Sequence, residues 1–170
     1  MKLMNGLTRD NLVEAYQKRF SKSQMKEIIA GIDDSVDVSV YAKECYNNRQ
    51  MEQLRIGLSE NLDVSSYADP TLNSAHMMVI LRGLRRRIDM SPYIKQGFSA
   101  AQMNEILDGL LFGVDVSVYV DTRYSPDQMC EIYTGLIDDL DVSRYADPSL
   151  TADEMQQIRI ALIEEVEKAS

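Results

Sequence analysis

The sequence predicts an all-α fold, an α-solenoid of six helix-plus-short-turn repeats behind an N-terminal capping helix. A methionine recurs every 26 residues, a helix-capping signal precedes each one by four residues, and an Asp-Val-Ser-x-Tyr motif follows most of them. A period of about 20 to 50 residues is typical of repeat arrays. The six marker methionines are Met25, Met51, Met77, Met103, Met129 and Met155.

Residues 1–19 precede the first repeat and do not fit the 26-residue period. Thr8 is a candidate N-cap for a helix over residues 9–19, with Leu7 and Leu12 as its hydrophobic staple. An atypical first helix would cover the open end of the array. We therefore expect one domain over 1–170, made of this cap and six repeats at 20–45, 46–71, 72–97, 98–123, 124–149 and 150–170.

Each repeat begins with the signature of a helix N-terminus. In the fourth repeat, Ser99 is followed three residues later by Gln102, which is the capping-box pattern, and Phe98 and Met103 stand at the two positions of a hydrophobic staple. The equivalent pairs are Ser21/Gln24, Asn47/Gln50, Asn73/His76, Ser125/Gln128 and Thr151/Glu154. Six helix starts are predicted by this mechanism.

Within each helix, apolar residues fall three, seven and eleven positions after the methionine, as Ile106, Leu110 and Val114 do in the fourth repeat. These positions form one buried stripe at helical periodicity. Six positions after the methionine stands a glycine, Gly109 here, or Ala161 in the last repeat. Because glycine inside a helix costs about 1 kcal/mol relative to alanine, we expect a close approach by a neighbouring backbone there.

The Asp-Val-Ser-x-Tyr motif predicts a short helical turn after each helix. Its serine is the expected N-cap, because Pro92 follows Ser91 in the third repeat and proline favours the first helical position. The tyrosine is expected in the core and the aspartate in a local turn. A metal site along the aspartates is the alternative, but repeats about 8–10 Å apart cannot share one ion. The aspartates are Asp37, Asp63, Asp89, Asp115 and Asp141.

The bulk properties predict a cytoplasmic protein that does not enter a membrane. No stretch approaches the roughly 20 apolar residues of a membrane span, and the N-terminus has no signal-peptide core. The cysteines, Cys45 and Cys130, lie in different repeats and form no CxxC pair. A net charge of −9 argues against direct nucleic-acid binding. It leaves open a basic protein partner, or a surface that imitates the charge of nucleic acid.

The sequence predicts no catalytic residue, no cofactor and no metal site, so we do not expect an enzyme. His76 is the only histidine and replaces the glutamine of a capping box. A general base would need a nucleophile beside it, and none is indicated. Cys130 has no second thiol or histidine at ligand spacing. A hydrolase that uses His76 is the least favoured alternative.

A candidate partner-binding surface lies on the third and fourth repeats. Positions one, two, five, eight and nine after the methionine point away from the buried stripe. In these two repeats they hold apolar side chains interleaved with arginine, which is typical of an interface core. The alternative is that these side chains pack on neighbouring turns. The candidate residues are Met78, Val79, Arg82, Arg85, Arg86, Leu111 and Phe112.

The repeat pattern, seen in FSAAQMNEILDGLLFGVDVSVY and YSPDQMCEIYTGLIDDLDVSRYADP, resembles short helical repeats in proteins of gut Firmicutes, their phages and conjugative elements. The resemblance covers about residues 20–170 and is specific for the repeat type. Small acidic proteins of mobile elements resemble inhibitors of host defence nucleases, including anti-CRISPR proteins. By analogy, the resemblance implies a non-catalytic inhibitor that docks on a basic, nucleic-acid-handling enzyme. A structural or self-assembling scaffold is the alternative, and the oligomeric state stays open.

Overall fold

The computed structural model describes residues 8–169 of the chain. Within this range the backbone forms eight α-helices, four short 3-10 helices and no strand, so the expected all-α class is confirmed. None of the described helices is long and apolar enough to cross a membrane. The helices belong to two compact units: unit 1 ends at Ser91 and unit 2 begins at Pro92.

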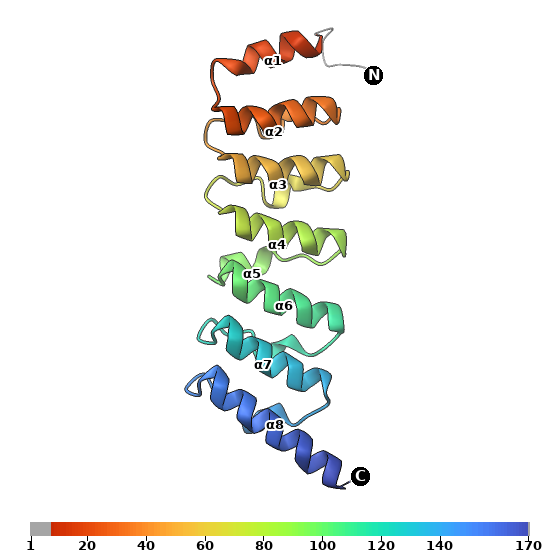
Figure 1. Ribbon diagram of the computed structural model, residues 1–170, viewed down its shortest axis with the longest axis vertical. Helices are drawn as coiled ribbons and strands as arrows, with labels where there is room; N and C mark the ends of the chain where they lie inside the picture. The colour runs from red at the N-terminus through yellow and green to blue at the C-terminus, as the bar shows by residue number, and fades with distance from the viewer. Residues whose placement is uncertain (1–7, 170) are drawn as a thin grey trace. The chain divides into compact units, whose positions relative to one another are not determined.

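Unit 1 consists of helices that pack side by side in chain order. Helix α1 contacts α2, α2 contacts α3, and α3 contacts α4 (Figure 1). A short 3-10 helix follows α2 and another follows α3, and each packs on the helix before it. The elements are α1 (Arg9–Gln17), α2 (Lys22–Asp33), η2 (Val38–Val40), α3 (Asn48–Ser59), η3 (Val64–Ser66) and α4 (Ser74–Arg85).

Unit 2 repeats the same plan. Helix α6 packs on α7 and α7 on α8, and a 3-10 helix packs on each of the first two (Figure 1). A five-residue helix, α5 (Ser91–Lys95), spans the border between the units. The other elements are α6 (Ala100–Phe112), η4 (Val116–Val118), α7 (Pro126–Ile137), η5 (Val142–Arg144) and α8 (Ala152–Ala169).

The predicted helix starts are confirmed. Every predicted capping residue accepts a hydrogen bond from a backbone N–H in the first turn of its helix, and five pairs close the box in both directions. In α6, the Ser99 hydroxyl accepts from the Gln102 N–H at 3.2 Å, and Gln102 Oε1 accepts from the Ser99 N–H at 2.9 Å. The predicted staple of Leu7 with Leu12 includes a residue outside the described part of the chain. The caps are Thr8, Ser21, Asn47, Asn73, Ser99, Ser125 and Thr151.

The buried stripe is shorter than its prediction. The residues three positions after the methionine are fully buried from α2 to α7, as Ile106 is at 0% exposure. Helix α6 ends at Phe112, and the Gly109 carbonyl accepts from the Val114 N–H at 3.1 Å after the left-handed turn at Gly113. The fourth stripe position, Val114, therefore lies in the loop, because the helix stops two residues before it.

The interior glycines face a tyrosine of their own repeat, so the prediction of a neighbouring backbone was wrong at four of the five positions. A Cβ placed on Gly109 would overlap the Tyr119 hydroxyl oxygen. That hydroxyl donates to the Glu105 carbonyl at 3.2 Å, one helical turn before the glycine. Gly31, Gly57 and Gly135 face Tyr41, Tyr67 and Tyr145 in the same way. At Gly83 the nearest atoms belong instead to the Ile88 carbonyl and the Met90 side chain.

The short 3-10 turns begin two residues earlier than predicted, because the aspartate of the motif caps them instead of the serine. Asp115 Oδ1 accepts from the Ser117 N–H at 3.0 Å, and η4 starts at Val116. The predicted serine caps are therefore wrong, including Ser91, which is the first residue of α5. Asp63 behaves as Asp115 does. The local-turn role of these aspartates is confirmed, because an Asp side chain reaches the backbone two residues on.

Candidate interaction surface

The seven candidate residues fall on two helices that belong to different units. Four lie on α4 of unit 1, Arg86 is the C-cap of that helix, and the other two lie on α6 of unit 2.

On α4, Met78 is 43% exposed whereas Val79 is completely buried. Val79 therefore does not belong to an exposed surface, and its inclusion was wrong. The helical position two after the methionine faces the adjacent helix, and its equivalent Glu27 is only 7% exposed. On α2 this position faces α3, because Glu27 pairs there with Arg55.

The arginines of α4 differ in their surroundings. Arg85 makes a two-pronged ion pair with Glu60 of α3, with N–O distances of 2.7 and 2.6 Å. This pairing raises the pKa of Arg85 and lowers the pKa of Glu60. Arg82 is half-buried and Arg86 is exposed at the helix end. Arg85 thus connects α4 to the C-terminal end of α3.

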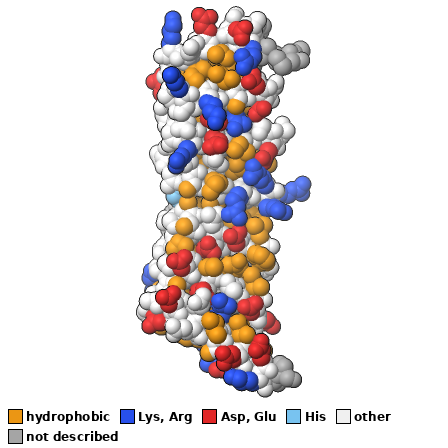
Figure 2. Space-filling view, viewed as in Figure 1, with side chains coloured by type: hydrophobic (Ala, Val, Ile, Leu, Met, Phe, Trp, Pro, Cys, Tyr) orange, Lys and Arg blue, Asp and Glu red, His pale blue; other side chains and the backbone are white. Residues whose placement is uncertain are grey.

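On α6, the predicted apolar pair is exposed at the C-terminal end of the helix. Leu111 is 42% and Phe112 65% exposed. The Phe112 ring lies 6.0 Å, centroid to centroid, from the ring of Tyr133 on α7. Ile137, one turn further along α7, is 43% exposed. We call Leu111, Phe112, Tyr133 and Ile137 the apolar patch. Figure 2 shows hydrophobic side chains on the visible face of unit 2.

Tyr133 and Ile137 were not predicted as part of a surface, although the sequence holds a signal for Tyr133. Tyr133 stands four positions after Met129. The same position holds Arg55 after Met51 and Arg159 after Met155. Arg55 Nε binds Glu27 at 3.1 Å and its Nη1 binds Asp34 at 3.2 Å. Tyr133 instead contacts Phe112, which occupies the position of Asp34 in its repeat.

Arg159 makes the same contacts in unit 2 that Arg55 makes in unit 1. Its Nε binds Glu131 of α7 at 2.9 Å, and its Nη1 lies 3.7 Å from Asp138. Both arginine side chains are largely buried, at 19% and 15% exposure. An arginine between two carboxylates of the preceding repeat thus occurs at two contacts, α2–α3 and α7–α8, whereas Leu81 holds the equivalent position on α4. At the α6–α7 contact an aromatic pair takes its place.

The negative charge of the chain belongs to unit 2. From Pro92 onward the sequence has 15 Asp and Glu residues against 5 Lys and Arg residues, a formal charge of −10. Up to Ser91 it has 12 acidic against 13 basic residues, a formal charge of +1. The apolar patch thus lies on the strongly acidic unit, where the field favours a positively charged partner.

Two groups at the patch, Tyr133 and Cys130, have pKa values raised in favour of their neutral forms. Burial raises the pKa of Tyr133, and Cys130, Asp108 and Glu105 raise it further. Burial and the charge of Glu105 likewise raise the pKa of the Cys130 thiol. A reactive cysteine needs a lowered pKa, so Cys130 is not an activated nucleophile.

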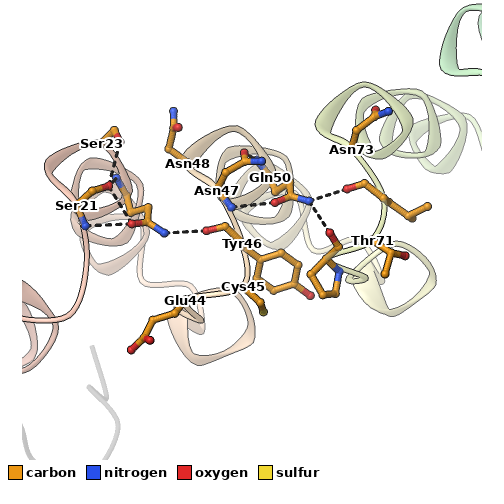
Figure 3. A pocket seen from close by; sticks show the side chains of 13 residues that line it. Ser21, Ser23, Glu44, Cys45, Tyr46, Asn47, Asn48, Gln50, Thr71 and Asn73 are labelled. Atoms are coloured by element: carbon orange, nitrogen blue, oxygen red, sulfur yellow. Dashed lines mark hydrogen bonds between the residues drawn. The ribbon is translucent and has the colours of Figure 1, made fainter.

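A polar hollow in unit 1 is occupied by the structural hydrogen bonds of the fold (Figure 3). Gln50 Nε2 donates to the carbonyls of Leu72 and Pro70 at 2.6 and 3.1 Å, and Gln24 Nε2 donates to the Tyr46 carbonyl at 2.8 Å. The same amides take part in the capping boxes. The polar groups of this hollow connect successive repeats, and they offer no catalytic constellation.

Among the described residues, no three or more His, Cys, Asp or Glu side chains are grouped as metal ligands would be. His76 lies in the first turn of α4, where its backbone N–H donates to Asn73 Oδ1 at 3.0 Å. No family model, curated protein or solved structure matches this chain.

Proposed function

We propose that this chain is a non-catalytic, protein-binding helical-repeat module of the α-solenoid type. The observation that carries the proposal is Phe112, a large aromatic side chain 65% exposed at the end of a well-packed helix. Exposed aromatic residues beside further apolar side chains are typical of binding hot spots. Leu111 and Ile137 extend the apolar area to both sides of the contact between α6 and α7.

The finer proposal is an inhibitor, of the kind carried by mobile elements, that docks on a basic nucleic-acid-handling enzyme. Its support is the charge of −10 on unit 2. A dense acidic surface attracts enzymes whose own surfaces are positive because they bind phosphate backbones. An anti-CRISPR-like activity is one form that such inhibition would take, and the binding mode requires no catalytic residue in this chain.

The test is capture from a lysate of a Firmicutes bacterium with the wild-type chain and two variants. Phe112→Asp removes the central aromatic side chain, and Thr122→Asp adds the same charge at an exposed loop position before α7. We expect a partner that wild type and Thr122→Asp retain and Phe112→Asp loses, with equal melting temperatures for all three. Purified partner should then lose nucleic-acid binding or cleavage when the chain is added. A partner retained equally by Phe112→Asp would contradict the proposal.

A self-assembling scaffold is the second candidate. The observation in its favour is that the chain carries both an acidic, apolar surface on unit 2 and exposed cations at the end of α4, Arg86 and Arg87. Solution mass across a concentration series separates the candidates. A wild-type mass that grows with protein concentration, together with a monomeric mass for Phe112→Asp, favours the scaffold.

A further inference from the structure

An apolar groove of about 630 Å³ runs along the contact between α1 and α2 in unit 1. Phe20 and Met25 form its floor and are only 8% and 7% exposed, whereas Val13 and Ile29 are half-buried along its sides. Helix α1 has nine residues and α2 has twelve, so the first helix leaves part of its neighbour uncovered. A volume of this size is typical of sites for small molecules.

Two lysines stand at the edge of this groove. Lys22 and Lys26 are one helical turn apart and lie on the same face of α2 as Met25 and Ile29. Both lysines are exposed, and neither forms an ion pair with another residue between 8 and 169. Two ammonium groups are therefore held beside an apolar floor.

The surroundings of the groove favour an anion. Residues 8–29 contain five basic and three acidic side chains, a formal charge of +2, whereas unit 2 has a formal charge of −10. Among the six marker methionines, only Met25 has a lysine both three residues before it and one residue after it. The paired lysines therefore belong to this groove and are not a general feature of the repeat.

We propose that the groove binds a free aliphatic carboxylate, such as a medium-chain fatty acid, with its tail between α1 and α2 and its carboxylate at Lys22 and Lys26. Ammonium groups form charge-assisted hydrogen bonds with a carboxylate. From Lys22 to Ile29 the helix rises about 10 Å, which suits a tail of medium length. The inference goes beyond the proposed protein-binding function, which rests on unit 2.

The depth of the groove favours a thin tail over a flat surface. Side chains that enter a bilayer or the pocket of a partner protein project outward from their own surface. Phe20 and Met25 are almost fully buried and do not project. An alkyl chain can reach such side chains between the two helices, whereas a membrane surface or a folded protein cannot.

Titration calorimetry of the full chain with decanoate tests the proposal, at concentrations below those at which decanoate forms micelles. Acetate has the carboxylate without the tail, and decyltrimethylammonium has the tail with the opposite charge. We expect saturable one-to-one binding of decanoate and Kd values about tenfold or more higher for the other two ligands. Absence of decanoate binding, or equal Kd values for decanoate and decyltrimethylammonium, would overturn the assignment.

Charge variants show whether the two lysines hold the carboxylate. Lys22→Gln combined with Lys26→Gln removes both cations and should raise the Kd of decanoate about tenfold or more. Lys43→Gln combined with Arg49→Gln removes two exposed cations elsewhere in unit 1 and should leave the Kd within about twofold of wild type. An equal rise in the two double variants would mean that general attraction between charges holds the ligand, and the site would be wrong.

A second pair of variants tests the position of the tail. Val13→Phe fills the groove and should abolish saturable binding, whereas Ala15→Phe adds the same ring at an exposed position of α1 and should retain it. Melting temperatures show whether both variants fold. In wild type, decanoate should shift the NMR signal of the Met25 methyl group but not that of its equivalent Met129 in unit 2. An unshifted Met25 signal at saturation would place the ligand elsewhere.

Other occupants of the groove give different results. If phosphatidylglycerol vesicles sediment with wild type but not with the lysine double variant, the occupant is a lipid surface. If the partner captured through Phe112 is also lost by the lysine double variant, the groove belongs to a protein interface. Either result would overturn the assignment to a free carboxylate. Failure of decanoate to bind would leave capture through Phe112 unaffected, so it is distinct from failure of the proposed function.

Discussion

At the scale of single residues, the tyrosine of each short turn fixes how the turn packs on its helix. The Tyr119 hydroxyl reaches the Glu105 carbonyl through the space that Gly109 leaves without a side chain. The side chain is completely buried, as are those of Tyr41 and Tyr67. A buried phenol needs a hydrogen-bond acceptor, and the helix provides one only where no Cβ stands in the way.

Replacement of Gly109 by alanine should therefore destabilise the protein, even though alanine is the better helix former. The new methyl group would overlap the Tyr119 hydroxyl and approach Val116 Cγ1 to 3.0 Å. Overpacking of this kind costs about 1–3 kcal/mol, and the denaturant midpoint would measure it. In the background of Tyr119→Phe, which removes the overlapping oxygen, the cost of Gly109→Ala should fall. Equal costs in the two backgrounds would contradict the close contact.

The same tyrosines predict a loss of stability in alkaline solution. Burial raises the pKa of Tyr145 from 10.0 to about 12, and it raises those of Tyr41, Tyr67 and Tyr119 as well. Because the folded pKa lies above the unfolded one, the stabilisation is fully present below pH 10 and disappears as the pH rises through the folded pKa. The melting temperature should fall between about pH 10 and 12. Tyrosinate absorbance should rise in two phases, the second together with unfolding.

At the scale of the helix, the capping glutamine has two functions. Gln102 Oε1 closes the capping box of α6, and its Nε2 donates to the carbonyls of Tyr124 and Thr122, which precede α7. Gln128 Nε2 likewise donates to the carbonyls of Leu150 and Pro148, and so connects α7 to the segment before α8. Only an amide can perform both functions. A carboxylate can accept the hydrogen bond from the backbone N–H of the capping residue, but it cannot donate to the carbonyls before the next helix.

Two substitutions should separate these functions. Ser99→Ala removes the cap alone and should cost about 1 kcal/mol. Gln102→Glu keeps the acceptor for the Ser99 N–H but leaves the Tyr124 and Thr122 carbonyls without their donor, which should cost about 1–3 kcal/mol. Urea titration measures both. Thr151–Glu154 is a natural box with a carboxylate, so Glu154→Gln should be nearly neutral. A neutral Gln102→Glu would mean that the amide contacts contribute nothing.

At the scale of the whole molecule, the border between the units falls in the repeat whose sequence departs most from the others. There Asp89-Met-Ser-Pro-Tyr93 replaces the usual motif, and its last three residues begin the helix α5 instead of a 3-10 turn. Tyr93 packs against Phe98, with ring centroids 6.0 Å apart, and Met90 takes the place beside Gly83. The change in motif therefore changes which side chain packs on the helix.

The all-α class and the helix starts could be predicted from sequence because capping is local, within four residues. Gly109 was misinterpreted because its neighbour is a side chain ten residues later, and a period alone does not show which atoms meet. Val79 is buried although it lies outside the predicted stripe, and the equivalent Glu27 on α2 is buried as well because it pairs with Arg55 of α3. Tyr133 could have been found by aligning the repeats, which places it with Arg55 and Arg159.

The unequal charge of the units predicts that salt acts on them in opposite directions. Unit 2, at −10, is destabilised by its own repulsion, which salt screens with a Debye length of about 10 Å at 0.1 M. Unit 1, at +1, has little net repulsion and keeps exposed ion pairs such as Arg85–Glu60 that salt weakens. Raising NaCl from about 10 to 300 mM should slow amide hydrogen exchange in α6 and α7 and leave it unchanged or faster in α2 and α3.

Hydrogen exchange followed by mass spectrometry resolves the two units in the intact chain. Asp127→Asn combined with Asp139→Asn removes two exposed carboxylates from unit 2 and should reduce the effect of salt there without changing unit 1. The matched control, Lys22→Gln combined with Lys26→Gln at exposed positions of α2, should leave the response of unit 2 unchanged. If salt changed hydrogen exchange equally in both units, the net charge of unit 2 would not affect its stability. Screening of its internal repulsion should otherwise act on unit 2 alone.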